Sequence, residues 1–129
     1  MANTLPGSPL TVFASAERTA TSSSSVRKIA GDQYRGLLVI IDCTVDGALA
    51  SVVFTVESNS NSTADTFTTQ LESPAVAATG STILVLHEDA PTDRANAIEK
   101  TPIEKFWRIT ATHADADAIT YSVVAWPLV

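Results

Sequence analysis

The sequence has few charged side chains, and most of them are acidic. Only 17% of its 129 residues are Asp, Glu, Lys or Arg, compared with roughly 25% in ordinary soluble domains. The formal net charge is −6, and the eight Lys and Arg residues are scattered along the chain. Binding to phosphates or to an anionic bilayer requires a cluster of basic residues. We therefore expect neither nucleic acid nor a membrane as a partner.

Cysteine is almost absent. Cys43 is the single one, so the chain cannot form an internal disulfide. It lies in the apolar run Leu37–Val45, which favours a buried and unreactive thiol over the alternative of a catalytic thiolate.

Long hydrophobic runs are also missing. The longest, "LLVII", is far shorter than the ~20 residues that a membrane-spanning helix needs. The stretch Met1–Phe13 has no basic start and no long apolar core, so we expect no secretory signal and synthesis in the cytoplasm.

Sequence motifs of known catalytic sites are lacking too. The chain has no phosphate-binding loop, no dinucleotide fingerprint, no Cys/His spacing typical of zinc sites and no Gly-x-Ser-x-Gly nucleophile turn. We therefore expect no cofactor and no enzymatic activity.

Short runs rich in Thr and Val dominate what is present, and β-branched residues of this kind favour strands. The run Gly36–Val45 begins apolar on both faces, which predicts a central strand covered on both sides. The segment Ala90–Pro102 predicts a loop with at most one or two helical turns. We expect eight strands in all: Leu10–Ala14, Ser25–Ala30, Gly36–Val45, Ser51–Ser58, Thr66–Leu71, Ser81–Glu88, Glu104–His113 and Ala118–Trp126.

This pattern predicts an all-β fold with little helix: an antiparallel β-sandwich, jelly-roll-like, of about eight short strands. The length fits one domain. Within it we expect residues 1–24 to form an N-terminal arm and first strand, partly flexible, and residues 25–129 to form the sandwich. The Ser-rich stretch Thr19–Ser25 predicts a flexible loop or the junction of the arm.

The last two predicted strands read as a closing hairpin, with His113, Asp115 and Asp117 at its turn. Turn chemistry is the favoured interpretation, because Asp often bonds its own backbone two residues downstream. A cation held by these three residues and an acid–base pair remain the alternatives. A helix–loop–helix calcium site does not fit, because counting from Asp115 places Thr120 where that loop requires Gly. His87 could also meet His113 in space.

The two tryptophans, Trp107 and Trp126, allow two interpretations. Tryptophan on an open sheet face can stack on sugars, whereas a buried tryptophan fills a core or an interface. The core or interface interpretation is favoured, and a glycan-binding face is the alternative.

The stretch "FWRITATHADADAITYSVVAW" resembles a pattern in small virion proteins of tailed bacteriophages: an aromatic-Trp-Arg run, a strand, a His-x-Asp-x-Asp turn and a Tyr-Ser-Val strand. "SVVFTVESNS" and "AVAATGSTILVL" are similar to earlier parts of such proteins, so the resemblance covers roughly Val39 to the end. The loop Asp89–Lys100 departs from it, because this loop is more charged than the apolar, Ala-rich loop of the family.

The resemblance implies a non-enzymatic virion component, most directly a head decoration or cement protein on the capsid exterior, assembled in the host cytoplasm. Its implied partners are the major capsid protein and further copies of itself, with a trimer favoured. The leader Met1–Pro9 would then be an arm that orders on the capsid. A tail or neck protein and a glycan-binding host-attachment module are the alternatives. Interface candidates are Leu5, Pro6, Pro9, Arg94 and Trp126.

Overall fold

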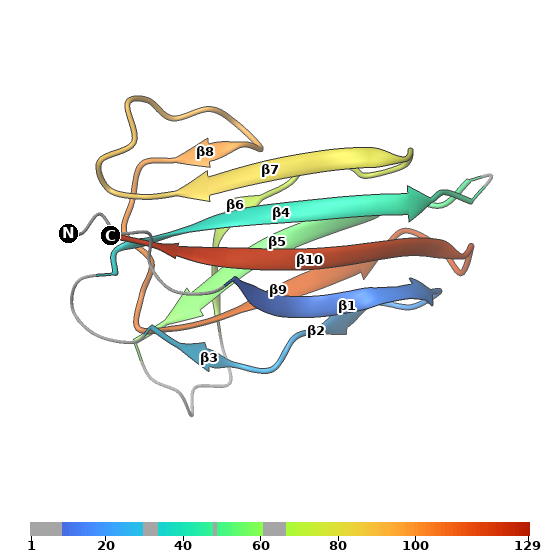
Figure 1. Cartoon of the computed structure of the whole chain (residues 1–129), viewed down its shortest axis with the longest axis horizontal. Helices are drawn as coiled ribbons and strands as arrows, with labels where there is room; N and C mark the ends of the chain where they lie inside the picture. Colours follow the sequence, from blue (N-terminus) through green and yellow to red (C-terminus); the bar gives the residue numbers. More distant parts are fainter. Residues whose placement is uncertain (1–8, 30–33, 48, 61–66) are drawn as a thin grey trace.

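The computed structural model describes residues 9–29, 34–47, 49–60 and 67–129. The described residues contain ten strands and no helix, and the strands form two sheets stacked as a β-sandwich (Figure 1). The all-β prediction is therefore confirmed. The strands are β1 Leu10–Arg18, β2 Ser22–Ser23, β3 Arg27–Lys28, β4 Gly36–Val45, β5 Val52–Asn59, β6 Thr68–Glu72, β7 Gly80–Leu86, β8 Ile98–Glu99, β9 Phe106–His113 and β10 Ile119–Leu128.

Sheet A has the strand order β1-β10-β4-β7-β8, and sheet B has the order β2-β9-β5-β6, with β3 also paired to β9. All pairs are antiparallel except β7 with β8, which is parallel. Six of the nine connections between successive described strands cross from one sheet to the other. Only β5 and β6 are consecutive strands that pair with each other antiparallel.

The closing hairpin predicted from the sequence is therefore wrong. β9 belongs to sheet B and β10 to sheet A, so the link between His113 and Ile119 crosses from one sheet to the other. The alternation in each strand correctly predicted its buried face. In the folded chain these two apolar faces lie opposite each other across the core instead of side by side in one sheet.

The core lies between the sheets and is made of alternate residues of the long strands. Trp107, Tyr121 and Phe54 are the largest of its fully buried side chains. Tyr121 contacts the Phe54 ring edge-on, with the ring centroids 4.9 Å apart, an arrangement that aromatic pairs favour. Full burial of a large apolar side chain stabilises the fold by about 1.5–3 kcal/mol.

The prediction for β4 was correct in its bounds and its central position, but wrong in expecting both faces of the strand to be covered. Leu37, Val39 and Ile41 are fully buried between the sheets, whereas Leu38 and Ile40, on the other face, are only half-buried. The described residues place no second layer over this outer face of sheet A, which is the face viewed in Figure 1.

The N-terminal part of the described chain is more ordered than the sequence predicted. β1 pairs with β10 along Leu10–Arg18, so the predicted first strand is present, belongs to sheet A and extends beyond its predicted end at Ala14. The Ser-rich stretch contains β2, which pairs with β9, and only Arg27–Lys28 of the predicted strand Ser25–Ala30 is extended as β3. The leader residues 1–8 lie outside the described residues.

Arginine side chains donate hydrogen bonds to several backbone carbonyl groups of β1, which is an edge strand of sheet A. Arg27 donates to the Thr11 carbonyl at 2.8 Å, and Arg18 donates to the carbonyls of Ala14 and Ala16 at 2.6 and 3.2 Å. The pairing of β1 with β10 is also irregular at Phe13, and bulges of this kind twist an edge strand.

Candidate functional site

The turn after β9 is built by its own backbone contacts. The Asp115 carboxylate accepts a hydrogen bond from the Asp117 backbone N–H at 2.9 Å, which is the Asx turn that the sequence favoured. Asp115 and Asp117 are exposed. His113 lies apart from them, because its Nε2 is 3.0 Å from the Tyr121 hydroxyl. Among the described residues, no group of three or more His, Cys, Asp or Glu could hold a metal ion.

A cluster of Arg18, Tyr121, His113 and Phe13 lies beside this turn. The Arg18 guanidinium carbon is 4.8 Å from the centre of the Tyr121 ring and 5.2 Å from that of Phe13, within the range of cation–π contact. Arg18 Nη1 also donates to the Tyr121 carbonyl at 2.9 Å. The role of Arg18 could not be predicted from the sequence, because a single arginine at the end of a strand carries no local signature.

Burial sets the proton affinities in this cluster. It lowers the pKa of His113 below its usual value, and the nearby Arg18 charge lowers it further, while Asp115 opposes the shift. Burial raises the pKa of Tyr121, and Arg18 partly offsets that. Tyr121 is fully buried, so its hydroxyl is closed to a substrate. The cluster therefore joins β1, β9 and β10.

The second histidine does not meet the first. His87 follows β7, whereas His113 ends β9, and these two strand ends lie at opposite ends of the sandwich (Figure 1). His87 Nε2 is 3.0 Å from the carbonyl oxygen of Val129, and its Nδ1 accepts from the Asp89 backbone N–H at 2.9 Å. Its ring lies close to Gly36, where a Cβ atom would be 2.8 Å from His87 Cδ2.

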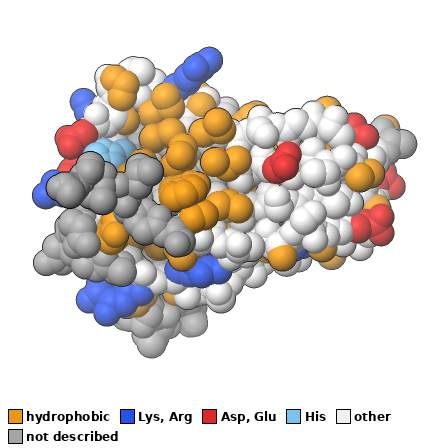
Figure 2. All heavy atoms as spheres, viewed as in Figure 1, with side chains coloured by type: hydrophobic (Ala, Val, Ile, Leu, Met, Phe, Trp, Pro, Cys, Tyr) orange, Lys and Arg blue, Asp and Glu red, His pale blue; other side chains and the backbone are white. Residues whose placement is uncertain are grey.

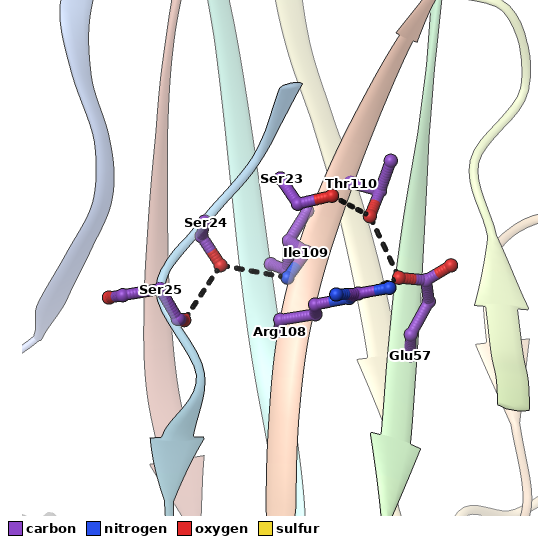
Figure 3. A network of polar contacts seen from close by, with 7 residues as sticks. All are labelled: Ser23, Ser24, Ser25, Glu57, Arg108, Ile109 and Thr110. Carbon is purple, nitrogen blue, oxygen red and sulfur yellow. Dashed lines mark hydrogen bonds and ion pairs between the residues drawn. The ribbon is translucent and has the colours of Figure 1, made fainter. Parts of the chain in front are cut away.

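The outer face of sheet B carries a polar network (Figure 3). Glu57 Oε1 accepts from Arg108 Nε and from the Thr110 hydroxyl, each at 2.8 Å. Because the Thr110 proton is used on the carboxylate, the Ser23 hydroxyl 2.8 Å away donates to Thr110. Arg108 also lies over the Phe67 ring at 4.5 Å. All of these groups have partners within the fold.

Ser24, which follows β2, makes a second set of contacts with β9. Its backbone N–H donates to the Ile109 carbonyl at 2.8 Å, and its hydroxyl accepts from the Ile109 N–H at 3.0 Å (Figure 3). Hydroxyl groups thus hold the Ser-rich stretch on β9. This explains how a segment without apolar alternation becomes part of a sheet.

The two tryptophans that could stack on a sugar and the cysteine that could act as a thiolate are mostly buried. Trp107 is 1% exposed, so it cannot stack on a sugar and belongs to the core. Trp126 is half-buried on the outer face of sheet A. Cys43 is buried, and burial raises the pKa of its thiol, which keeps it protonated and weakly nucleophilic.

The interface candidates fall in different places. Leu5 and Pro6 lie outside the described residues. Pro9 is exposed immediately before β1. Arg94 is exposed in the loop between β7 and β8, far along the chain from Pro9. Trp126 belongs to a continuous apolar surface.

That surface, the apolar patch, lies on the outer face of sheet A and crosses three neighbouring strands. Register places Ile83, Ile40 and Val124 in one row across the sheet, with Val85, Leu38 and Trp126 in the next. Figure 2 shows hydrophobic side chains gathered on one part of this face, and mainly uncharged polar surface beyond it. Asp42 marks the limit of the patch, since it pairs with Ser81 and Ser122. The apolar patch consists of Leu38, Ile40, Ile83, Val85, Val124 and Trp126.

The connection from β7 to β9 is a loop, as predicted for Ala90–Pro102, and it contains the short strand β8 and no helical turn. β8 pairs in parallel with the end of β7, and Arg94 and Ile98 exchange backbone hydrogen bonds, each at 2.8 Å. The Asp93 carboxylate accepts from the Lys100 N–H at 2.7 Å, and the Asn96 side chain donates to the Glu72 carbonyl at 3.1 Å. Residues 91–96 are all exposed. This segment, residues 88–100, is called the β8 loop below.

Comparison with known proteins adds no relative. No family model matches the chain, and no curated protein matches it.

In the described part of the chain, no helix has the length and apolar character needed to cross a membrane.

Proposed function

We propose that this chain is a structural component of a tailed-bacteriophage virion, most directly a decoration protein that binds the major capsid protein on the outside of the head. The role is non-enzymatic. The cluster at Arg18, the network at Glu57 and the Asx turn at Asp115 each use their polar groups within the fold. Assembly onto the shell would take place in the host cytoplasm.

The strand order supports this proposal. β1, β10, β4 and β7 lie opposite β2 with β3, β9, β5 and β6, and the chain alternates between these two sets. We assign this order to a jelly roll, in which two four-stranded sheets interleave, an architecture common in viral capsid proteins and lectins. Fold alone does not select a role, so the proposal depends on the surface.

The observation that carries the proposal is the β8 loop. It is exposed, it bears charges of both signs, and backbone pairing with β7 and the Asp93 contact hold it in one conformation. A contact surface that is already ordered loses little conformational entropy on binding. Arg94 is an exposed cation of this loop, and Arg is enriched among residues that dominate interfaces. We place the capsid contact here.

Sedimentation with empty capsids tests the proposal. The protein should co-migrate with shells of the major capsid protein encoded in the same genome, at near-stoichiometric ratio. Arg94→Ala should weaken this binding about ten-fold, equal to about 1.4 kcal/mol. Lys28→Ala, which removes the same charge from an exposed position on β3, is the matched control and should bind normally. Absence of co-migration at every salt concentration would refute the proposal.

The number of copies per virion distinguishes a head protein from a tail or neck protein. Hundreds of copies per particle would agree with decoration of the shell, whereas six or twelve would identify a ring protein.

A further inference from the structure

The apolar patch is a sheet face over which the described residues pack no second layer. Of its six side chains, Ile83 is 54% exposed and the others are half-buried. The two apolar rows contain no charged residue. A contiguous apolar patch on a protein surface is often a contact surface.

We propose that the apolar patch binds the same patch of a second copy, forming a two-fold symmetric dimer in which two A sheets pack face to face. The chemistry of the patch favours this occupant. The two rows present only aliphatic and indole groups, so a complementary surface must also be flat, apolar and uncharged. The corresponding outer face of sheet B is polar, with Arg108, Glu57 and Thr110 at its centre. The patch itself is therefore the matching sheet face that the described chain offers, which makes the contact isologous and closed.

Charge selects the orientation of the two copies. Acidic residues gather at the end of the sandwich where β4 finishes: Glu17, Asp46, Asp115 and Asp117, with Arg18 as the basic residue there. The opposite end, where β4 begins, carries both signs: Lys28, Arg35 and Lys105 lie there together with Glu88, Asp89 and Glu104, and Arg35 is paired with Glu88 (Figure 1). Strands running in the same direction would place acidic end over acidic end and Asp42 beside its copy.

A two-fold axis that crosses the strands avoids this repulsion. It reverses the second copy, so each acidic end lies beside the end of mixed charge, and the two Asp42 carboxylates stand at opposite limits of the contact. It also places the row of Ile40 and Ile83 over the partner's row of Leu38 and Val85, so Trp126 lies over the partner's smaller Val124. Aligned packing of two sheets at about 10 Å is the way β-sandwiches bury apolar faces.

The expected dimer is weak. Three strands about 4.8 Å apart and two apolar rows with their margins give a patch of roughly 15 by 20 Å. A stable interface buries about 800 Å² on each partner, so the apolar patch is its centre, and neighbouring Ser and Thr side chains must supply the remainder. A chain with net charge −6 also repels its copy. Added salt screens that repulsion and should strengthen the dimer.

Analytical ultracentrifugation of the full chain over a concentration series tests the proposal without capsids, so the result is independent of the proposed function. The wild-type protein should approach twice the mass of one chain as concentration rises, and more readily at higher salt. Ile83→Lys should weaken association at least ten-fold. Val45→Lys is the matched control, because Val45 is 56% exposed and lies off the patch near the end of β4. It adds the same charge and should leave association unchanged.

Circular dichroism and thermal unfolding of both variants confirm that they fold. A wild-type protein that is monomeric at every concentration, a trimer such as the phage resemblance implies, or equal association of Ile83→Lys and wild type would each overturn the dimer. If Ile83→Lys instead abolishes binding to shells while the wild type remains monomeric, the patch binds the capsid protein and not a second copy.

Discussion

The Arg18 guanidinium lies 4.8 Å over the Tyr121 ring while one of its nitrogens donates to the Tyr121 backbone carbonyl at 2.9 Å. One side chain from β1 thus holds both the ring and the backbone of the same residue in β10. Arg18 also accounts for two carbonyls of its own strand, at Ala14 and Ala16. This arrangement requires the planar, multiply donating group of arginine.

Arg18→Lys should therefore destabilise the protein although it keeps the charge. A lysine ammonium cannot serve three carbonyls and lie flat on a ring, so we expect the free energy of unfolding to fall by about 1–3 kcal/mol. Urea unfolding measures the change. Lys28→Arg, at an exposed position on β3, should have an effect within about 0.5 kcal/mol. Equal stability of Arg18→Lys and wild type would mean that these contacts contribute nothing net.

His113 should make stability depend on pH. Burial and the Arg18 charge lower its pKa in the folded state below the ordinary value of 6.5, so the unfolded chain takes up a proton first as pH falls. The contribution is therefore fully present above pH 6.5 and is lost as pH falls through the lower folded-state pKa. His113→Gln should reduce the decrease in unfolding free energy over this range.

His87→Gln is the control for that pH series, since His87 lies at the other end of the sandwich. It should retain the pH dependence that His113 causes. Urea unfolding at several pH values below 7 provides the measurement, and a His113→Gln profile identical to that of wild type would contradict the assignment.

Gly36 should not tolerate a side chain. A Cβ atom there would lie 2.1 Å from the Leu86 carbonyl oxygen and 2.8 Å from His87 Cδ2. Because the Leu86 carbonyl is backbone, relief requires β4 and β7 to separate, and we expect Gly36→Ala to cost about 1–3 kcal/mol or more. Thermal unfolding tests this. Ser81→Ala, at an exposed position on β7, should leave the melting temperature nearly unchanged.

Cys43 should report global opening of the sandwich. Its thiol is buried, and burial raises its pKa, so a thiol reagent should modify the folded protein at least 100-fold more slowly than the urea-unfolded chain. A reagent that releases a chromophore on reaction with the thiol is used, and the absorbance of that chromophore measures the rate of modification. Rapid modification without denaturant would show that Cys43 is reached by local opening of β4.

Sequence patterns predicted the strands better than their partners. β4 matched its predicted bounds, and the buried rows at Phe54, Trp107 and Tyr121 were predicted by alternation. Alternation identifies the face a strand buries but not the strand beside it, which is why β9 and β10 were wrongly paired as a hairpin. In a two-layer fold, a short connection can turn within a sheet or cross between sheets, and both bury the same residues.

Other features left no pattern in the sequence. β2 is held by the hydroxyls of Ser23 and Ser24 rather than by apolar side chains, and β8 is two residues within a charged loop. The contacts of Arg18 join residues 103 positions apart in the chain. The Asx turn at Asp115 was local, so the sequence could predict it.

The arginine contacts to the edge strand β1 also affect the tendency of the protein to aggregate at high concentration. The unbonded border of a sheet is a template on which foreign or identical strands can add without limit, giving fibrils. In β1 the Thr11 carbonyl is already bound by Arg27 from β3, so an incoming strand must displace that cation before it can pair there. The apolar outer face of sheet A can therefore be exposed for face-to-face association, while the edge at β1 disfavours the open-ended addition of strands.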